Sequence, residues 1–143
     1  LFPASLPHVI TAAAVGNDGP AAAPLYPASY PGVVGVTGVD RRGRPLPEAA
    51  RGPQVQFAAP GNNMVSATTG APPFRAVRGT SFAAPVVAAL LAPLHRQPEP
   101  GAAWEAVTAL AKQGKRAHAT TVSNDTGHGI VGASFRNDPS AFR

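Results

Sequence analysis

The chain has 143 residues, of which 44% are hydrophobic, so it is long enough for one domain with a buried core. It contains no cysteine, which excludes disulfide bonds and thiolate metal sites, and its 17 prolines and 15 glycines are scattered between apolar runs, as is typical of loops. The net charge is +5, but charged residues make up only 13% of the chain, so charge is a weak guide to function.

Three apolar segments predict the main strands of a sheet. HVITAAAVG (8–16) ends in turn residues, GVVGVTGVD (32–40) is rich in β-branched residues, and QVQFAAPG (54–61) turns at its Pro-Gly end. Runs that are apolar on both faces favour a parallel sheet covered by helices. Shorter strands are predicted at 64–68 and 74–78.

Two helices are predicted after the strands. The first begins at about Ser81 and ends near residue 91, before a Pro-rich linker, and the second covers 102–113. One stripe of the second helix carries Trp104, Val107, Leu110 and Ala111. The predicted fold is therefore α/β, a parallel sheet flanked by helices. Because three strands leave an open edge, we expect the sheet to be incomplete on its N-terminal side.

The stretch RGTSFAAPVVAALL (78–91) places Ser81 at the start of an apolar helix. A serine hydroxyl reacts when a base accepts its proton, a third group orients that base, and donors stabilise the oxyanion that forms. At a helix start the N–H of Ser81 has no intrahelical partner, so it can point at developing negative charge. Pro85 costs little so near the helix start. The alternative is a serine that serves only as the N-cap.

Five motifs in order resemble those of the subtilisin-like serine peptidases, the subtilases. They are Ala14-Val15-Gly16-Asn17, Tyr26-Pro27-Ala28-Ser29-Tyr30-Pro31, Ala58-Ala59-Pro60-Gly61, Gly79-Thr80-Ser81-Phe82-Ala83-Ala84-Pro85 and Gly127-His128-Gly129-Ile130-Val131. The resemblance implies a subtilisin-like fold, with Ser81 as the nucleophile and Asn17 as the side-chain donor of the oxyanion hole. It also implies five substrate-binding residues: Ala13, Ala14, Val15, Gly16 and Thr80. The small side chains of the first four would leave room in the pocket for a large substrate side chain.

The catalytic Asp and His of the subtilases lie N-terminal to the segment that matches here. None of the chain's four histidines is a good substitute. His95 follows Ser81 by about 20 Å of helix, and His8 precedes Asn17 by up to about 30 Å of extended chain. His118 lies in a polar loop, and no motif supports it.

Three further residues that could carry chemistry are expected to be structural. His128 takes the place of an aromatic packing residue of the family, and Asp18 and Asp40 are expected to serve turns and caps. No cluster of ligands maps to a metal site, and we expect neither a metal nor a cofactor.

We therefore expect residues 1–143 to be the C-terminal part of a single subtilase-like peptidase domain. The expected reaction is hydrolysis of a peptide bond in a peptide or protein substrate, through an acyl-enzyme at Ser81. The chain alone should have little activity without the Asp and His of an N-terminal half, which is the expected partner. The start of the chain lacks an initiator methionine and the basic region of a signal peptide. The resemblance implies an extracellular or periplasmic location.

Two alternatives remain from the sequence. The first is a non-catalytic binding or assembly module with half of a protease fold, which the open sheet edge favours. The second is a basic module that binds polyanions through Arg41, Arg42, Arg44 and Arg51. No aromatic residues lie between these arginines to stack on bases, so we expect no nucleic-acid partner. The apolar run 9–15 is shorter than the about 20 residues that cross a membrane, so we expect no membrane partner either.

Overall fold

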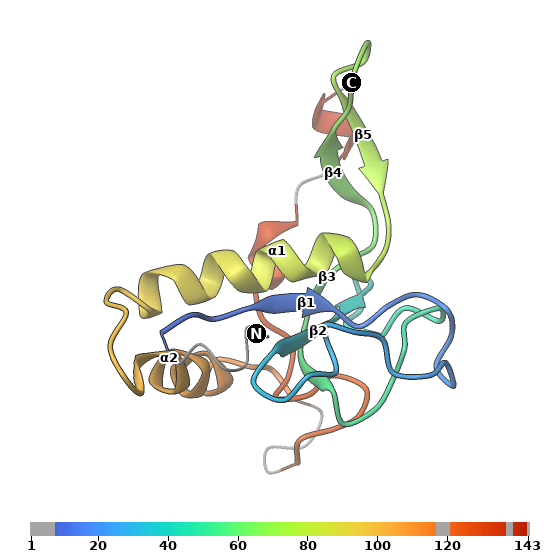
Figure 1. Ribbon diagram of the computed structural model, residues 1–143. Coiled ribbons are helices and arrows are strands. Elements are labelled where there is room, and N and C mark those ends of the chain that lie inside the picture. Colours follow the sequence, from blue (N-terminus) through green and yellow to red (C-terminus); the bar gives the residue numbers. More distant parts are fainter. Residues whose placement is uncertain (1–7, 117–120, 137–138, 143) are drawn as a thin grey trace.

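The computed structural model describes residues 8–116, 121–136 and 139–142 (Figure 1). Its elements confirm the α/β fold, a parallel sheet flanked by helices, and each predicted strand and helix is present. The sheet strands are β1 (Ala12–Ala14), β2 (Val34–Val39) and β3 (Val55–Pro60), and the separate hairpin is β4 (Met64–Ala67) and β5 (Phe74–Val77). The helices are α1 (Thr80–Leu91) and α2 (Ala102–Ala111), with single 3-10 turns at Ala92–Leu94, Ala133–Phe135 and Pro139–Phe142.

The sheet has the order β1-β2-β3, and all three strands are parallel. β1 is much shorter than the predicted strand 8–16, because only Ala12–Ala14 pair with β2. The β2–β3 ladder shifts register between Gly35 and Val36, which face Val55 and Phe57 respectively. Gln56 is the extra residue of this bulge, and it turns Phe57 toward the opposite face of the sheet from Val55.

One face of the sheet shares a core with both helices. Phe57 of β3, Val87 of α1 and Leu110 of α2 are fully buried in it. Trp104 is 74% exposed, so the predicted apolar stripe of α2 is wrong at that residue. Ala106 and Leu110 define the buried side, which is offset around the helix from Trp104, and the apolar spacing alone did not fix which side would face the core.

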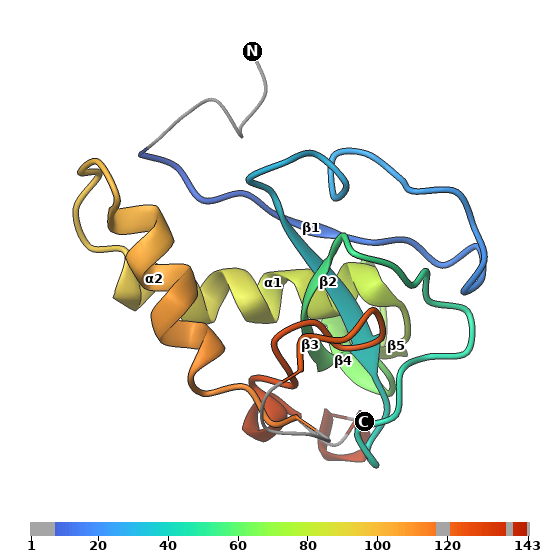
Figure 2. The same cartoon turned by 90° about the horizontal axis from the view of Figure 1, so that it is seen from below.

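The opposite face of the sheet is covered by loops. Val15, Ala28, Ala50 and Val55 form a second buried cluster there. The outer edge of β3 is lined by the C-terminal segment, because the N–H of His128 donates to the carbonyl of Gln56 and the N–H of Val131 donates to that of Ala58. The Gly-His-Gly-Ile-Val motif is thus a structural strip along β3 (Figure 2).

Helix α1 begins one residue earlier than predicted. Gly79 is the N-cap, with no side-chain capping bond, and Ser81 is the second helical residue. The alternative in which Ser81 is the N-cap is therefore wrong. α1 contains no charged residue, and its outer face exposes Ser81, Pro85, Ala88 and Ala89. Its first turn lies at the end of the sheet toward which β1 runs (Figure 1).

Candidate active site

The end of β1 and the start of α1 are joined directly by hydrogen bonds. The N–H of Thr80 donates to Oδ1 of Asn17 at 3.0 Å, and the N–H of Gly16 lies 3.3 Å from Oγ1 of Thr80. Thr80 is fully buried, while Asn17 and Ser81 are exposed. Two segments more than sixty residues apart in sequence thus meet, and they bring Asn17 beside Thr80, the residue before Ser81.

The bond to Thr80 fixes the orientation of the Asn17 amide. A backbone N–H can donate only to the oxygen of a side-chain amide, so Oδ1 faces Thr80 and the Nδ2 group is left to donate elsewhere. Among the described residues, neither Nδ2 of Asn17 nor the N–H of Ser81 has a hydrogen-bond acceptor. Two donors without a described partner thus remain in this region, one on the turn after β1 and one at the start of α1.

Glycines allow the backbone of this site to pack closely. Gly79 has a φ of 139°, a conformation that favours glycine, and a Cβ there would lie 3.5 Å from Nδ2 of Asn17. The N–H of Gly79 donates to the carbonyl of Gly61 at 2.8 Å. A Cβ on Gly61 would lie 2.9 Å from both Cα of Gly38 and the carbonyl oxygen of Gly79. The Pro-Gly turn after β3 therefore supports the segment before Ser81 through backbone contacts alone.

The predicted substrate-binding residues lie along β1 and the turn after it. Ala13 and Ala14 are half-buried, whereas Val15 is fully buried, so Val15 can offer only its backbone to a ligand. Gly16 has a φ of 104°, and a Cβ there would lie 2.5 Å from Cδ1 of Leu25. Leu25 was missed from the sequence, because nothing local to the 24–31 loop indicated that it folds over Gly16. Its side chain is 40% exposed beside the predicted substrate wall.

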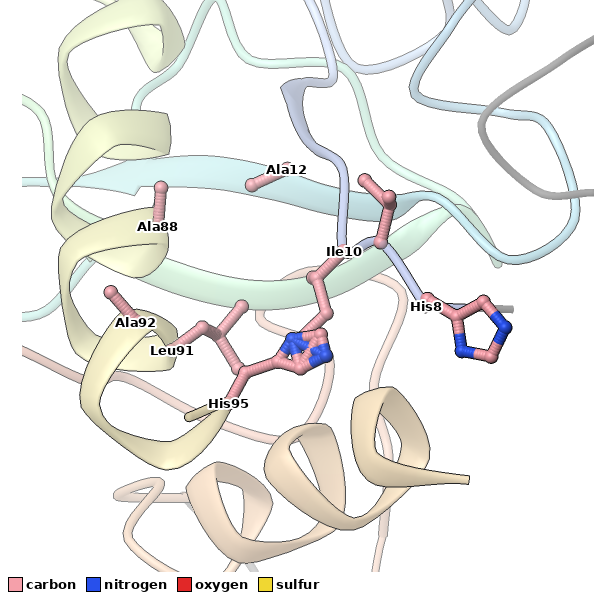
Figure 3. A pocket seen from close by; sticks show the side chains of 8 residues that line it. His8, Ile10, Ala12, Ala88, Leu91, Ala92 and His95 are labelled. Atoms are coloured by element: carbon pink, nitrogen blue, oxygen red, sulfur yellow. The ribbon is translucent and has the colours of Figure 1, made fainter. Parts of the chain in front are cut away.

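Two of the histidines lie far from Ser81. His8 and His95 line a pocket of about 340 Å³ together with Ile10, Leu91 and Ala92 (Figure 3). This pocket is at the C-terminal end of α1, whereas Ser81 is at its N-terminal end. Fourteen helical residues correspond to about 20 Å, so neither histidine is placed to take the proton of Ser81.

The other two histidines are His118 and His128. His118 lies outside the described residues. The ring of His128 packs against Phe57 at a centroid distance of 5.5 Å, and its carbonyl accepts a bond from Nε of Arg116. Burial lowers the pKa of His128, and the nearby charge of Arg116 lowers it further. These contacts are those of a packing residue.

The two carboxylates named in the sequence analysis, Asp18 and Asp40, lie in the turns that follow β1 and β2. Asp40 accepts hydrogen bonds from the N–H groups of Arg42 and Arg44 and pairs with the Arg44 guanidinium, so it serves the turn after β2 as expected. Burial opposes its ionisation, but the bonds from Arg44 and Arg42 outweigh this, and its pKa is lowered. Asp18 is exposed in the turn beside Asn17. In the described part of the chain, no three His, Cys, Asp or Glu side chains gather as they would around a metal ion.

None of the helices in residues 8–116, 121–136 and 139–142 combines the length and the apolar character needed to cross a bilayer.

The chain is similar in sequence to known peptidases. The subtilase family model matches residues 4–129. The thermostable alkaline protease of Halalkalibacterium halodurans is 37% identical over 84 residues, which are 59% of this chain and 23% of that protein. The minor extracellular protease Epr of Bacillus subtilis is 36% identical over 95 residues, which are 62% of this chain and 14% of that protein.

A solved structure shows the same fold over most of this chain. The prenylagaramide maturation protease PagA superposes with a TM-score of 0.71 and 27% identity, over 90% of this chain and 49% of that chain. This chain thus spans about half of that structure and less than a quarter of the two curated relatives. Since the family model covers most of its length, the chain belongs to the subtilase family of peptidases.

Proposed function

We propose that the chain supplies the nucleophile and the oxyanion-binding half of a serine endopeptidase. The observation that carries the proposal is the 3.0 Å bond from the Thr80 N–H to Oδ1 of Asn17, which joins the Asn17 turn to the residue before Ser81 and leaves Nδ2 free to donate. In the proposed reaction, Oγ of Ser81 attacks the carbonyl carbon of a peptide bond. The carbonyl oxygen becomes an oxyanion, and the two free donors stabilise it.

After this attack, the proposed reaction proceeds through an acyl-enzyme. The tetrahedral intermediate expels the amine, which leaves an acyl group on Ser81, and water then hydrolyses this ester. In our proposal the peptide lies along Ala13, Ala14 and Gly16, with Leu25 bounding the space over Gly16 and buried Thr80 holding the loop before Ser81. The proton of Ser81 must pass to a base, and no described histidine of this chain lies close enough to accept it.

We further propose that residues 1–143 are the C-terminal part of one peptidase domain and that an N-terminal half supplies the Asp and His. The uncharged helix α1 supports this, because a helix that is apolar on all sides is ordinarily buried. Its outer face is flanked by the pocket of His8 and His95 and by a second apolar pocket of about 330 Å³ beside Phe82, Val86 and Phe135.

The open edge of the sheet supports the same partner. Within the described residues β1 pairs only with β2, so the other edge of β1 is available for a further strand. One related protease is named as extracellular, and on this ground we propose that the complete enzyme is exported. Its substrates are proposed to be peptides or proteins, as the family implies.

The proposed site can be tested on the chain as it exists with a fluorophosphonate probe, which phosphonylates nucleophilic serines as their oxygen displaces fluoride from phosphorus. Without a base, labelling should be slow, but the oxyanion donors should still favour Ser81 over exposed Ser134. The Ser81→Ala variant should abolish the selective label, and Asn17→Ala should reduce it. Equal labelling of Ser81 and Ser134 would argue against the site. Fast labelling of Ser81 would show that this chain already contains its base.

A non-catalytic assembly module is the second candidate, favoured by the open edge of β1 and the apolar face of α1. Light scattering during size-exclusion chromatography would report the oligomeric state of the purified chain. A stable monomer that melts cooperatively would count against any requirement for a partner.

A further inference from the structure

An ion pair between Arg78 and Glu48 joins the segment before Ser81 to the loop between β2 and β3. The guanidinium of Arg78 binds the carboxylate of Glu48 through two bonds, from Nε at 2.6 Å and from Nη2 at 2.8 Å. Arg78 directly precedes Gly79, the N-cap of α1. Glu48 lies in the loop between β2 and β3, thirty residues away in sequence.

The same loop also holds the turn that carries Asn17. The N–H of Gly19 donates to the carbonyl of Glu48 at 2.8 Å, and the N–H of Ala50 donates to the carbonyl of Gly16 at 3.0 Å. Glu48 therefore binds the turn of Asn17 through its backbone and the segment before Ser81 through its side chain. Asn17 and Thr80 close the third side of this triangle.

We infer that Glu48 and Arg78 are positioning residues that set the placement of the Asn17 turn relative to the start of α1. Removing the ion pair frees Arg78 from the loop of Glu48, so that the Asn17 turn is joined to the helix start by the bonds of Thr80 to Asn17 and Gly16 and no longer through Glu48. The catalytic consequence rests on the proposed function, whereas the positioning itself does not.

The geometry favours this role over that of an ordinary surface ion pair. The pairing is bidentate, which fixes direction as well as distance. The side chains of Arg78 and Glu48 are 44% and 31% exposed, so solvent screens the pair and its effect on overall stability should be small. A positioning contact should change the overall stability little but change the local backbone dynamics clearly.

The test measures hydrogen exchange of single backbone amides by NMR in the purified 143-residue chain. In Glu48→Ala and in Arg78→Ala, we expect exchange of the Thr80 and Gly19 amides to speed up by about two- to fivefold relative to the Val36 amide in β2. The Nδ2 resonances of Asn17 should shift in both variants. Arg44→Ala is the matched control, because it removes another surface arginine–carboxylate pair, with Asp40, that stays within its own turn.

A charge-swapped double variant, Glu48→Arg with Arg78→Glu, should return the exchange rates of both amides toward those of the natural chain. The inference is overturned if the single variants leave Thr80 and Gly19 within the range of the Arg44→Ala control. It is also overturned if the swapped pair fails to restore exchange while the Val36 amide stays protected. Ser81 reactivity is not measured, so failure of the proposed reaction would not affect this result.

Discussion

Replacing Asn17 with alanine should destabilise the fold as well as the site. Oδ1 of Asn17 is the acceptor for the N–H of Thr80, a residue that is fully buried. A buried donor that loses its acceptor costs about 1–3 kcal/mol. Because Asn17 itself is exposed, water can reach part of the vacated space, and we expect the lower part of this range, about 1–2 kcal/mol. For a chain of this size the melting temperature should fall by about 3–8 °C.

The matched variant is Asn17→Asp, which keeps an oxygen toward Thr80 and replaces the free Nδ2 donor with a second oxygen. A carboxylate near the start of α1 is also favoured by the helix dipole. Urea denaturation, followed by circular dichroism, should therefore show a loss for Asn17→Ala and little or none for Asn17→Asp. Both variants should lose selective fluorophosphonate labelling of Ser81, since removing the equivalent donor in a subtilisin lowers turnover by about a hundred- to a thousandfold.

Two results would refute this reasoning. If Asn17→Ala unfolds within about 0.5 kcal/mol of the natural chain, the Thr80 N–H does not depend on Asn17. If Asn17→Asp loses as much stability as Asn17→Ala, the acceptor oxygen is not the cause of the loss.

Three other predictions concern the core, the loop before Ser81 and the response to pH. Leu110→Ala should cost about 2–5 kcal/mol in urea denaturation because Leu110 is fully buried, whereas Trp104→Ala on the same helix should change stability by less than about 0.5 kcal/mol. Gly79→Ala should cost about 1–3 kcal/mol because of its φ of 139°, and thermal melts would detect the loss. Burial lowers the pKa of His128 from its ordinary value of 6.5, so below that pH the unfolded chain binds a proton first and stability falls. His128→Phe should flatten the dependence of the melting temperature between pH 5 and 7, and an unchanged slope would contradict this.

The sequence predicted the elements well because their signals are local. A run rich in β-branched residues was sufficient for β2, an alternating run that turns at Pro60-Gly61 for β3, and the apolar stretch after Gly79 for α1. Trp104 was placed wrongly because an apolar spacing indicates a stripe but not which neighbour the stripe meets. The sequence did not predict the one-residue bulge at Gln56 either, because the bulge depends on how β3 pairs with β2.

The candidate site was predictable only in part, for a related reason. Ser81 and Asn17 lie in recognisable motifs, so the sequence could name them. Leu25, Glu48 and Arg78 act on the site through contacts across loops, and nothing in their own surroundings distinguishes them. Such contacts follow from the fold and not from local pattern.

The hydrogen bonds of Arg136 limit the order in which parts of the chain can fold. Its Nη1 donates to the carbonyl of Asn62 at 2.7 Å and its Nη2 to the carbonyl of Val39 at 2.9 Å. One side chain near the end of the sequence therefore joins the last residue of β2 to the turn after β3. A ribosome releases this arginine long after both strands, so until then the two carbonyls lack its guanidinium, and that of Val39 has the N–H of Gly61 as its donor. The end of the sheet beside Asn17 can reach its final form only after residue 136 has left the ribosome.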